Sequence, residues 1–382
     1  MTLNRRQLLM SVAAALPDPS VESARAAFPW ASRETYLNSA TEHPLSVYSS
    51  RAMKNYIDAI TNGPDSERNK YENLRFQQET KAMFAQLVRA RPSEIAFVPS
   101  TQIGENLILE GLGVQTSGGN VVTNDLHYGG SLFNYGRRKE MGLDVRIVKH
   151  RDGQIDIRDV ERVVDKKTRL IAVALVSNVN GYVEDAVSLS KLAHAHGAYL
   201  YADVIQAAGA IPIDVRAMGI DFLACSAYKW LMGGRYGYLY VPDELQGKVL
   251  APTHFGGRGS GQNGAARYEV STASHIGCVC QHEALAYIHK LGVQNIRSHV
   301  RTLTERLQKE LPALGYPSVT PRGTDSPIVT FEFKNPEQVR SRLSKAGIIV
   351  TLRTGAEGNH MRVSPSVFNN RQDIDRLIQA LS

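Results

Sequence analysis

From about residue 93 onward, short apolar runs alternate with stretches that have the spacing of helices. The apolar runs are nearly continuous, which is typical of strands buried on both faces of a sheet. Helix-length segments between such strands favour a mainly parallel sheet with helices on both sides. We therefore predict one large α/β domain over residues 51–254, with strands at "EIAFVPS", "NVVTND", "DVRIVKH", "RLIAVALVSN", "AYLYAD", "DFLACS" and "YGYLYV".

The pattern changes after residue 254, where a segment rich in Gly and Ser extends to residue 277. Such a segment indicates a functional loop at a domain boundary. Two long helical stretches follow over about 279–311, and then strands and helices come in mixed order. We predict a smaller α+β domain over 255–382 that includes the loop 255–277, and we expect segment 29–50 to join it.

Composition narrows the classes of function. No apolar run approaches the roughly 18 residues that a membrane-spanning helix needs, so we expect a soluble protein without a membrane partner. The net charge of +7 is spread along the chain, and without a recognition motif it does not predict nucleic-acid binding. Three cysteines, Cys225, Cys278 and Cys280, are too few for a disulfide framework and lack the spacing of a zinc site, so no metal is expected.

The N-terminus differs from the rest of the chain. Arg5 and Arg6 precede a short, largely apolar stretch in "MTLNRRQLLMSVAAALPDPS", and "SARAA" follows shortly afterwards. This pattern resembles a twin-arginine export signal, which carries a folded protein from the cytoplasm to the periplasm. An N-terminal amphipathic helix from Asn4 explains the same residues, so both readings stay open and residues 1–28 are kept out of the fold argument.

Polar residues follow several of the predicted strands, at the edge where ligands bind in open α/β sheets. One strand ends at Asp203 with Gln206 three residues later, another ends at Ser177 and Asn178, and a third at Ser226 with Lys229 after it. Ser100, Thr101 and Gln102 open a helix after a fourth.

Each of these residues alone is more often a cap, a turn former or a solvated charge. Together they supply what pyridoxal phosphate needs: an amine for a Schiff base, a carboxylate for the pyridinium nitrogen, a donor to the ring hydroxyl and a phosphate cradle. The glycine motif of a nicotinamide site is not found after a first strand.

These motifs resemble the class V aminotransferases of the fold-type I pyridoxal phosphate enzymes, a family that includes cysteine desulfurases and isopenicillin N epimerase. The resemblance runs from "YLNSATEHPLS" to "HMRVSPSVFN". "SAYKWLMGGRYGYLYV" is similar to the family's serine, any residue, histidine, lysine stretch, which implies that Lys229 is the Schiff-base lysine. "ADVIQAAGAIPIDV" resembles its Asp-x-x-Gln element, which implies Asp203 at the pyridine nitrogen and Gln206 near the ring hydroxyl.

The resemblance also implies further cofactor contacts. For the phosphate it implies the helix start at Ser100, Thr101 and Gln102, the Ser226 hydroxyl, and Tyr228 where the family has a histidine. For the ring it implies an aromatic cover, for which we favour Tyr128 over His127, and it places Asn178 beside the hydroxyl. "ARYEVSTASHIG" resembles a loop that reaches the phosphate of the neighbouring subunit, which implies Thr272 in that role and a homodimer.

Arg362 matches the family's clamp for the carboxylate of an amino-acid substrate, and Arg353 is a second candidate. Desulfurases of one large branch carry a mobile cysteine between these positions, whereas "RTGAEGNHMR" has none. We therefore expect a carbon–sulfur lyase or aminotransferase without a persulfide relay, in which Lys229 also moves the proton. Epimerisation is an alternative, and a non-catalytic binding module is an alternative of another class.

Cys225 lies inside an apolar strand, so we expect it to pack in the core, whereas Cys278 or Cys280, near a helix start, could be reactive.

Overall fold

The protein is described by a computed structural model that covers residues 20–72, 74–255, 263–355 and 358–382. A seven-stranded sheet forms its centre, in the order β2-β8-β7-β6-β5-β3-β4. β8 runs antiparallel to both of its neighbours, while β7, β6, β5, β3 and β4 pair in parallel. In chain order the strands are β2 (Ile95–Val98), β3 (Asn120–Asn124), β4 (Asp144–Val148), β5 (Thr168–Ala174), β6 (Tyr199–Asp203), β7 (Phe222–Ser226) and β8 (Gly237–Tyr240).

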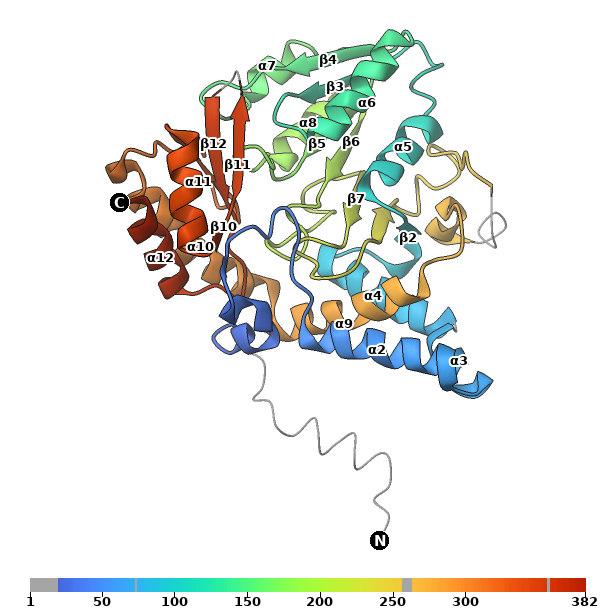
Figure 1. Ribbon diagram of the computed structural model, residues 1–382. Helices are drawn as coiled ribbons and strands as arrows, with labels where there is room; N and C mark the ends of the chain where they lie inside the picture. Colours follow the sequence, from blue (N-terminus) through green and yellow to red (C-terminus); the bar gives the residue numbers. More distant parts are fainter. Residues whose placement is uncertain (1–19, 73, 256–262, 356–357) are drawn as a thin grey trace.

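Helices cover both faces of this sheet, which is the predicted α/β arrangement (Figure 1). Side chains of successive strand residues point to opposite faces, so Leu223 and Cys225 join one core cluster while Phe222 and Ala224 join the other. The helices around the sheet are α2 (Val47–Asn62), α3 (Asp65–Glu72), α4 (Leu74–Val88), α5 (Thr101–Gly111), α6 (Gly129–Glu140), α7 (Ile157–Glu161), α8 (Ala186–Ala195) and α9 (His275–Leu291).

The C-terminal part of the chain builds a second, smaller layer beside the large sheet (Figure 1). Its three-stranded antiparallel sheet has the order β11-β12-β9, and Phe331, Met361 and Leu377 lie in its own core cluster. Its elements are α10 (Val293–Glu310), β9 (Val329–Glu332), α11 (Pro336–Lys345), β10 (Ile348–Ile349), β11 (Thr351–Gly355), β12 (Gly358–Val363) and α12 (Arg371–Leu381).

The N-terminal segment packs with this smaller layer. β1 (Thr35–Tyr36) pairs in parallel with β10, and Leu37 is buried in the same core as Phe331. By contrast, Cys278 and Leu285 of α9 are buried in a core cluster of the large sheet. The domain boundary at residue 254 stays a prediction, and α9 shows that residues beyond it help to cover the large sheet.

None of the helices in the described part of the chain is long and apolar enough to cross a bilayer.

Candidate active site

A cavity of about 240 Å³ lies where β6 and β7 end and α5 begins. β6 and β7 are neighbours in the sheet, and Asp203 pairs with Ala224, so the residues that follow both strands meet at one edge. The cavity is lined by Pro99, Ser100, Thr101, Gln102, Tyr128, Asp203, Ile205, Ser226, Tyr228, Lys229, Arg235 and Tyr236. Eight of the twelve are residues that the sequence predicted for the site, so the structure brings most of the predicted set together.

Lys229 and Asp203 form the charged centre of the cavity. Lys229 is 7% exposed and Asp203 is 2% exposed. Burial lowers the pKa of Lys229 to about 8, with Arg362 and Arg353 acting in the same direction and Asp203 opposing them. Burial raises the pKa of Asp203 to about 6, opposed by the N–H of Ile205, which donates to its carboxylate at 2.9 Å, and by Lys229. The amine is still mostly protonated at pH 7, but its neutral, nucleophilic fraction is far larger than that of an exposed lysine.

Thr101 and Ser226 join the start of α5 to the end of β7 by reciprocal hydrogen bonds. The N–H of Thr101 donates to Ser226 Oγ and the N–H of Ser226 donates to Thr101 Oγ1, both at 2.8 Å. Ser100 caps the helix, accepting from the N–H of Ile103 at 3.3 Å. Hydroxyls and helix-start amides at one place provide the donors that a phosphate group needs.

Gln206 is not among the described residues that line the cavity. Its Nε2 donates to the carbonyl of Ala40 at 3.0 Å, and its Oε1 accepts from the indole of Trp230 at 2.8 Å. Its side chain thus holds the turn after Lys229 against the N-terminal segment. A contact of Gln206 with the cofactor hydroxyl stays a prediction.

The two candidates for the aromatic cover point in different directions. Tyr128 lines the cavity and is 42% exposed, whereas His127 is fully buried beside it. The N–H of Tyr128 donates to His127 Nδ1 at 2.7 Å, and burial lowers the pKa of His127 to about 3. The ring is therefore neutral, and its proton is on Nε2. The geometry is in keeping with our preference for Tyr128.

His127 Nε2 faces a buried carboxylate that the sequence analysis did not single out. Glu105 Oε1 is 3.7 Å from this nitrogen and accepts from the Tyr135 hydroxyl at 2.7 Å. Glu105 Oε2 accepts from Ser131 at 2.7 Å and from Gln102 at 2.9 Å. Burial raises the pKa of Glu105 to about 7, opposed by the hydroxyls of Ser131 and Tyr135. The predicted phosphate residue Gln102 is thus tied to this network.

Arg362 and Arg353 lie close together and share a hydrogen-bond acceptor. Both donate to the carbonyl of Asn178, and Arg362 also donates to the hydroxyls of Thr41 and Thr351 at 2.6 and 3.1 Å. No carboxylate in the described part of the chain pairs with either arginine, and Arg362 Nε and Asn178 Oδ1 are buried without a hydrogen-bond partner. Burial lowers the pKa of both arginines, that of Arg362 to about 10. Two desolvated cations with only neutral acceptors fit a substrate carboxylate.

Thr272 is exposed, just ahead of α9, and is not among the described residues that line the cavity of its own chain.

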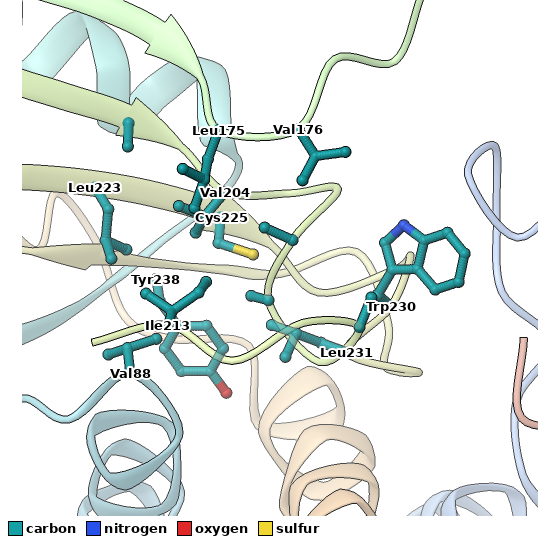
Figure 2. Packing of buried hydrophobic residues seen from close by; sticks show 14 of the residues in the cluster. Val88, Leu175, Val176, Val204, Ile213, Leu223, Cys225, Trp230, Leu231 and Tyr238 are labelled. Atoms are coloured by element: carbon teal, nitrogen blue, oxygen red, sulfur yellow. The ribbon is translucent and has the colours of Figure 1, made fainter. Parts of the chain in front are cut away.

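All three cysteines are fully buried. Figure 2 shows Cys225 packed in the cluster that contains Leu223, Val204 and Tyr238, as predicted for a core residue. Burial raises the pKa of each thiol, that of Cys278 to about 11. The expectation that Cys278 or Cys280 could be reactive finds no support here, because both the exposure and the thiolate form that reactivity needs are disfavoured.

Two features of the site escaped sequence reasoning. Glu105 is an acid four residues after Thr101, on the buried face of α5, and an acid in an otherwise apolar helix face is a signal that the sequence offered. Arg235 follows two glycines after Lys229, and its position in the cavity depends on how the turn between β7 and β8 closes. In the described residues no group of three or more His, Cys, Asp or Glu side chains is placed to hold a metal ion.

The chain is similar to known proteins over most of its length. The chain is 29% identical over 308 residues to a probable cysteine desulfurase of Methanothermobacter thermautotrophicus, covering 77% of this chain and 76% of that protein. It is 27% identical over 371 residues to the uncharacterized aminotransferase YcbU of Bacillus subtilis, covering 94% and 97%.

Among solved structures, the apo cysteine desulfurase of Thermococcus onnurineus NA1 superposes with a TM-score of 0.84 at 23% identity, covering 94% of this chain and 96% of that one. The cystine C–S lyase C-DES superposes with a TM-score of 0.81 at 20% identity, covering 93% and 98%. These likenesses confirm the predicted fold. The model of the aminotransferase class-V family matches residues 35–377, and the chain therefore belongs to the class V aminotransferases, a family of pyridoxal phosphate-dependent enzymes.

Proposed function

We propose that this enzyme is a carbon–sulfur lyase that acts on an amino acid or a cysteine conjugate, without passing sulfur to a cysteine of its own. The observation that carries the proposal is a buried Arg362 beside a half-buried Arg353, near Lys229 and Asp203, with no acidic partner for either arginine among the described residues. All three cysteines of the chain are buried.

The residues of the cavity fit pyridoxal phosphate. Lys229 offers an amine, Asp203 a carboxylate, and the start of α5 with Ser226 a set of neutral donors in the same cavity. Lys229 would hold the cofactor through Nζ, Asp203 would hold its pyridine nitrogen, and Tyr128 would cover its ring. When bound, the cofactor withdraws the electron pair that is left when a bond at the substrate Cα breaks.

The chain's own residues would bind and orient the substrate and move its proton. Arg362 and Arg353 would hold the α-carboxylate, exchanging the Asn178 carbonyl for a charged acceptor. The pKa of Lys229 near 8 suits an amine that takes the proton from Cα and returns it, because proton transfer is most efficient when the pKa lies near the working pH. In elimination the electron pair from Cα then expels the sulfur group from Cβ, and no thiol of the chain is required.

The test is to incubate the protein with L- and D-amino acids, cysteine conjugates and cysteine sulfoxides in deuterated water, with and without a keto acid. A lyase yields pyruvate and ammonia from a sulfur substrate, and Lys229→Ala should abolish both. Transfer of the amino group to the keto acid would instead assign an aminotransferase, and deuterium at Cα with inverted chirality an epimerase. A persulfide trapped on any cysteine would contradict the absence of a relay.

We also propose a homodimer in which Thr272 reaches the phosphate site of the other subunit. Thr272 is exposed just ahead of α9 and is not among the described residues that line the cavity of its own chain, which supports this assignment. Thr272→Ala should weaken cofactor retention in a protein that stays dimeric on gel filtration. A monomeric wild type with full activity would rule the shared site out.

A further inference from the structure

Tyr228 and Arg235 stand opposite each other across the turn that joins β7 to β8. Ser226 pairs with Gly237 at the end of the two strands, and the N–H of Ala227 donates to the carbonyl of Tyr236 at 2.6 Å. Continuing this register by one residue brings Tyr228 to Arg235. The guanidinium carbon of Arg235 lies 5.0 Å from the centre of the Tyr228 ring, within the range of a cation–π contact.

This pair lies beside the residues proposed to hold the phosphate. β8 also pairs with β2, with Gly237 opposite Val98, so the turn that carries Arg235 lies next to the residues that start α5. Arg235, Tyr228, Ser100, Thr101 and Ser226 line the same cavity.

The negative charge of a phosphate group would need a cationic side chain in this cavity. Among the described residues that line the cavity, the cationic side chains are Lys229 and Arg235, and Lys229 is committed to the covalent bond with the cofactor. A phosphate monoester carries about −1.5 to −2 charges at neutral pH. Hydroxyls and backbone amides carry no full positive charge, and one amide of the helix start, that of Thr101, already donates to Ser226. The neutral donors alone therefore leave most of the phosphate charge without a cationic partner.

The Arg235 side chain is free to take an anion. It is 74% exposed, and its acidic neighbour, Glu42, is 3.6 Å away, which is long for a charged hydrogen bond. We propose that Arg235, stacked on Tyr228, binds the phosphate of the cofactor and supplies the charged contact at a position where Tyr228 cannot. This inference rests on the proposed cofactor site, and it adds a ligand that the family motif does not contain.

The experiment compares two ligands that differ only in the phosphate. Apoprotein would be titrated with pyridoxal phosphate and with pyridoxal, and the dissociation constants read from the change in visible absorbance or tryptophan fluorescence. Arg235→Gln should raise the constant for pyridoxal phosphate about tenfold or more and leave that for pyridoxal within about twofold. Arg235→Lys should lie between, because an ammonium keeps the charge but not the planar fork.

Two further variants make the outcome specific. Arg340→Gln removes the same charge from an exposed site on α11 and should change neither constant. Tyr228→His in the Arg235→Gln background should recover part of the lost affinity, since an imidazole N–H can donate to the phosphate where the arginine no longer does.

The possible failures are distinguishable. Equal weakening of both ligands, or unchanged binding of pyridoxal phosphate by Arg235→Gln, would overturn the assignment of Arg235. A wild type that binds neither ligand would instead contradict the cofactor site itself.

Discussion

Arg353 and Arg362 donate hydrogen bonds to the same acceptor, the backbone carbonyl of Asn178, at 3.2 and 3.1 Å. They stand on neighbouring strands, and Arg353 lies opposite His360, two residues from Arg362. A neutral oxygen shared by two guanidinium groups leaves both cations without charge compensation. A carboxylate that enters between them would supply it.

Arg362→Ala should therefore raise KM for an amino-acid substrate steeply. A buried, charge-assisted contact is worth roughly 2 to 4 kcal/mol, which corresponds to about 30- to 1000-fold. The visible absorbance of the bound cofactor should stay unchanged. Arg353→Ala should act in the same direction with a smaller effect, because Arg353 makes fewer contacts in the site. Steady-state kinetics check both, and an unchanged KM for Arg362→Ala would mean that the carboxylate binds elsewhere.

The pKa of Lys229 predicts how cofactor uptake depends on pH. Only the neutral amine attacks an aldehyde, and below a pKa of about 8 the neutral fraction falls tenfold for each pH unit. The rate at which apoprotein takes up pyridoxal phosphate should rise with pH and level off near pH 8. Stopped-flow absorbance measures this rate.

Asp203→Asn is the matched control for that profile. The Asp203 carboxylate raises the pKa of Lys229, so its removal should move the inflection to lower pH. This variant should keep the covalent bond and lose most turnover, because the carboxylate that keeps the pyridine nitrogen protonated is gone. An inflection that moves to higher pH, or near-wild-type turnover, would show that Asp203 is the wrong acid.

The sequence predicted which residues lie at the ends of strands, but it did not predict where their side chains point. Asp203 and Ser226 were found because each ends an apolar strand, and neighbouring parallel strands end at one sheet edge. Spacing along the chain gives a position but not a side-chain direction. For Gln206, predicted near the cofactor ring hydroxyl, the spacing therefore did not give the side-chain hydrogen bonds to Trp230 and Ala40.

Side-chain direction also explains the other gaps. His127 and Tyr128 are adjacent in sequence, yet one is buried against Glu105 and the other lines the cavity. Arg235 enters the site only because β8 runs antiparallel to β7 and returns the chain to the same edge. The hydrophobic pattern of the sequence does not show in which direction β8 runs beside β7.

Glu105 should make the stability of the protein depend on pH. Burial raises its pKa in the folded state from 4.5 to about 7, so the folded protein binds more protons than the unfolded chain between these values. Its contribution to the free energy of unfolding is full below pH 4.5 and is lost as pH rises through 7, by at most about 1.4 kcal/mol per pH unit. Glu105→Gln should remove this slope.

Urea unfolding of wild type and Glu105→Gln at several pH values between 5 and 8 measures the difference. Asp203 and Glu184, which also have raised pKa values, contribute equally to both proteins and cancel. Glu337→Gln, on the surface of α11, serves as the control and should keep the wild-type slope. Parallel curves for wild type and Glu105→Gln would show that Glu105 does not titrate in this range.

The three cysteines should be dispensable for turnover. Cys225, Cys278 and Cys280 are fully buried, and burial raises the pKa of each thiol. Replacing each by alanine should leave kcat within about twofold in every soluble variant, with only a loss of stability of about 1 kcal/mol from lost packing. Thiol labelling should be slow in the native protein and fast after denaturation. A tenfold loss of kcat in any variant of normal stability would reopen the sulfur relay.

The last prediction concerns the N-terminus. The Arg5 and Arg6 pair lies outside the described residues, but the residues after it pack firmly. Arg25 pairs with Asp373 at 2.7 Å, and the Phe28 ring lies 5.2 Å from that of His43 and 5.3 Å from that of Phe368. Removing Arg25 would leave a buried carboxylate without its cation. If the protein is exported, we therefore expect cleavage ahead of residue 24, not after "SARAA".

Fractionation of cells and sequencing of the mature N-terminus test this expectation. Replacing Arg5 and Arg6 by lysine should hold the enzyme in the cytoplasm with its cofactor bound, because a twin-arginine route carries folded proteins. A mature chain that starts at Phe28 would contradict the expected cleavage site. Residue 25 would then be lost on cleavage, so the mature forms of wild type and Arg25→Gln should be equally stable. An enzyme found only in the cytoplasm, with Met1 or Thr2 still at its N-terminus, would instead show that the segment is an N-terminal helix and not an export signal.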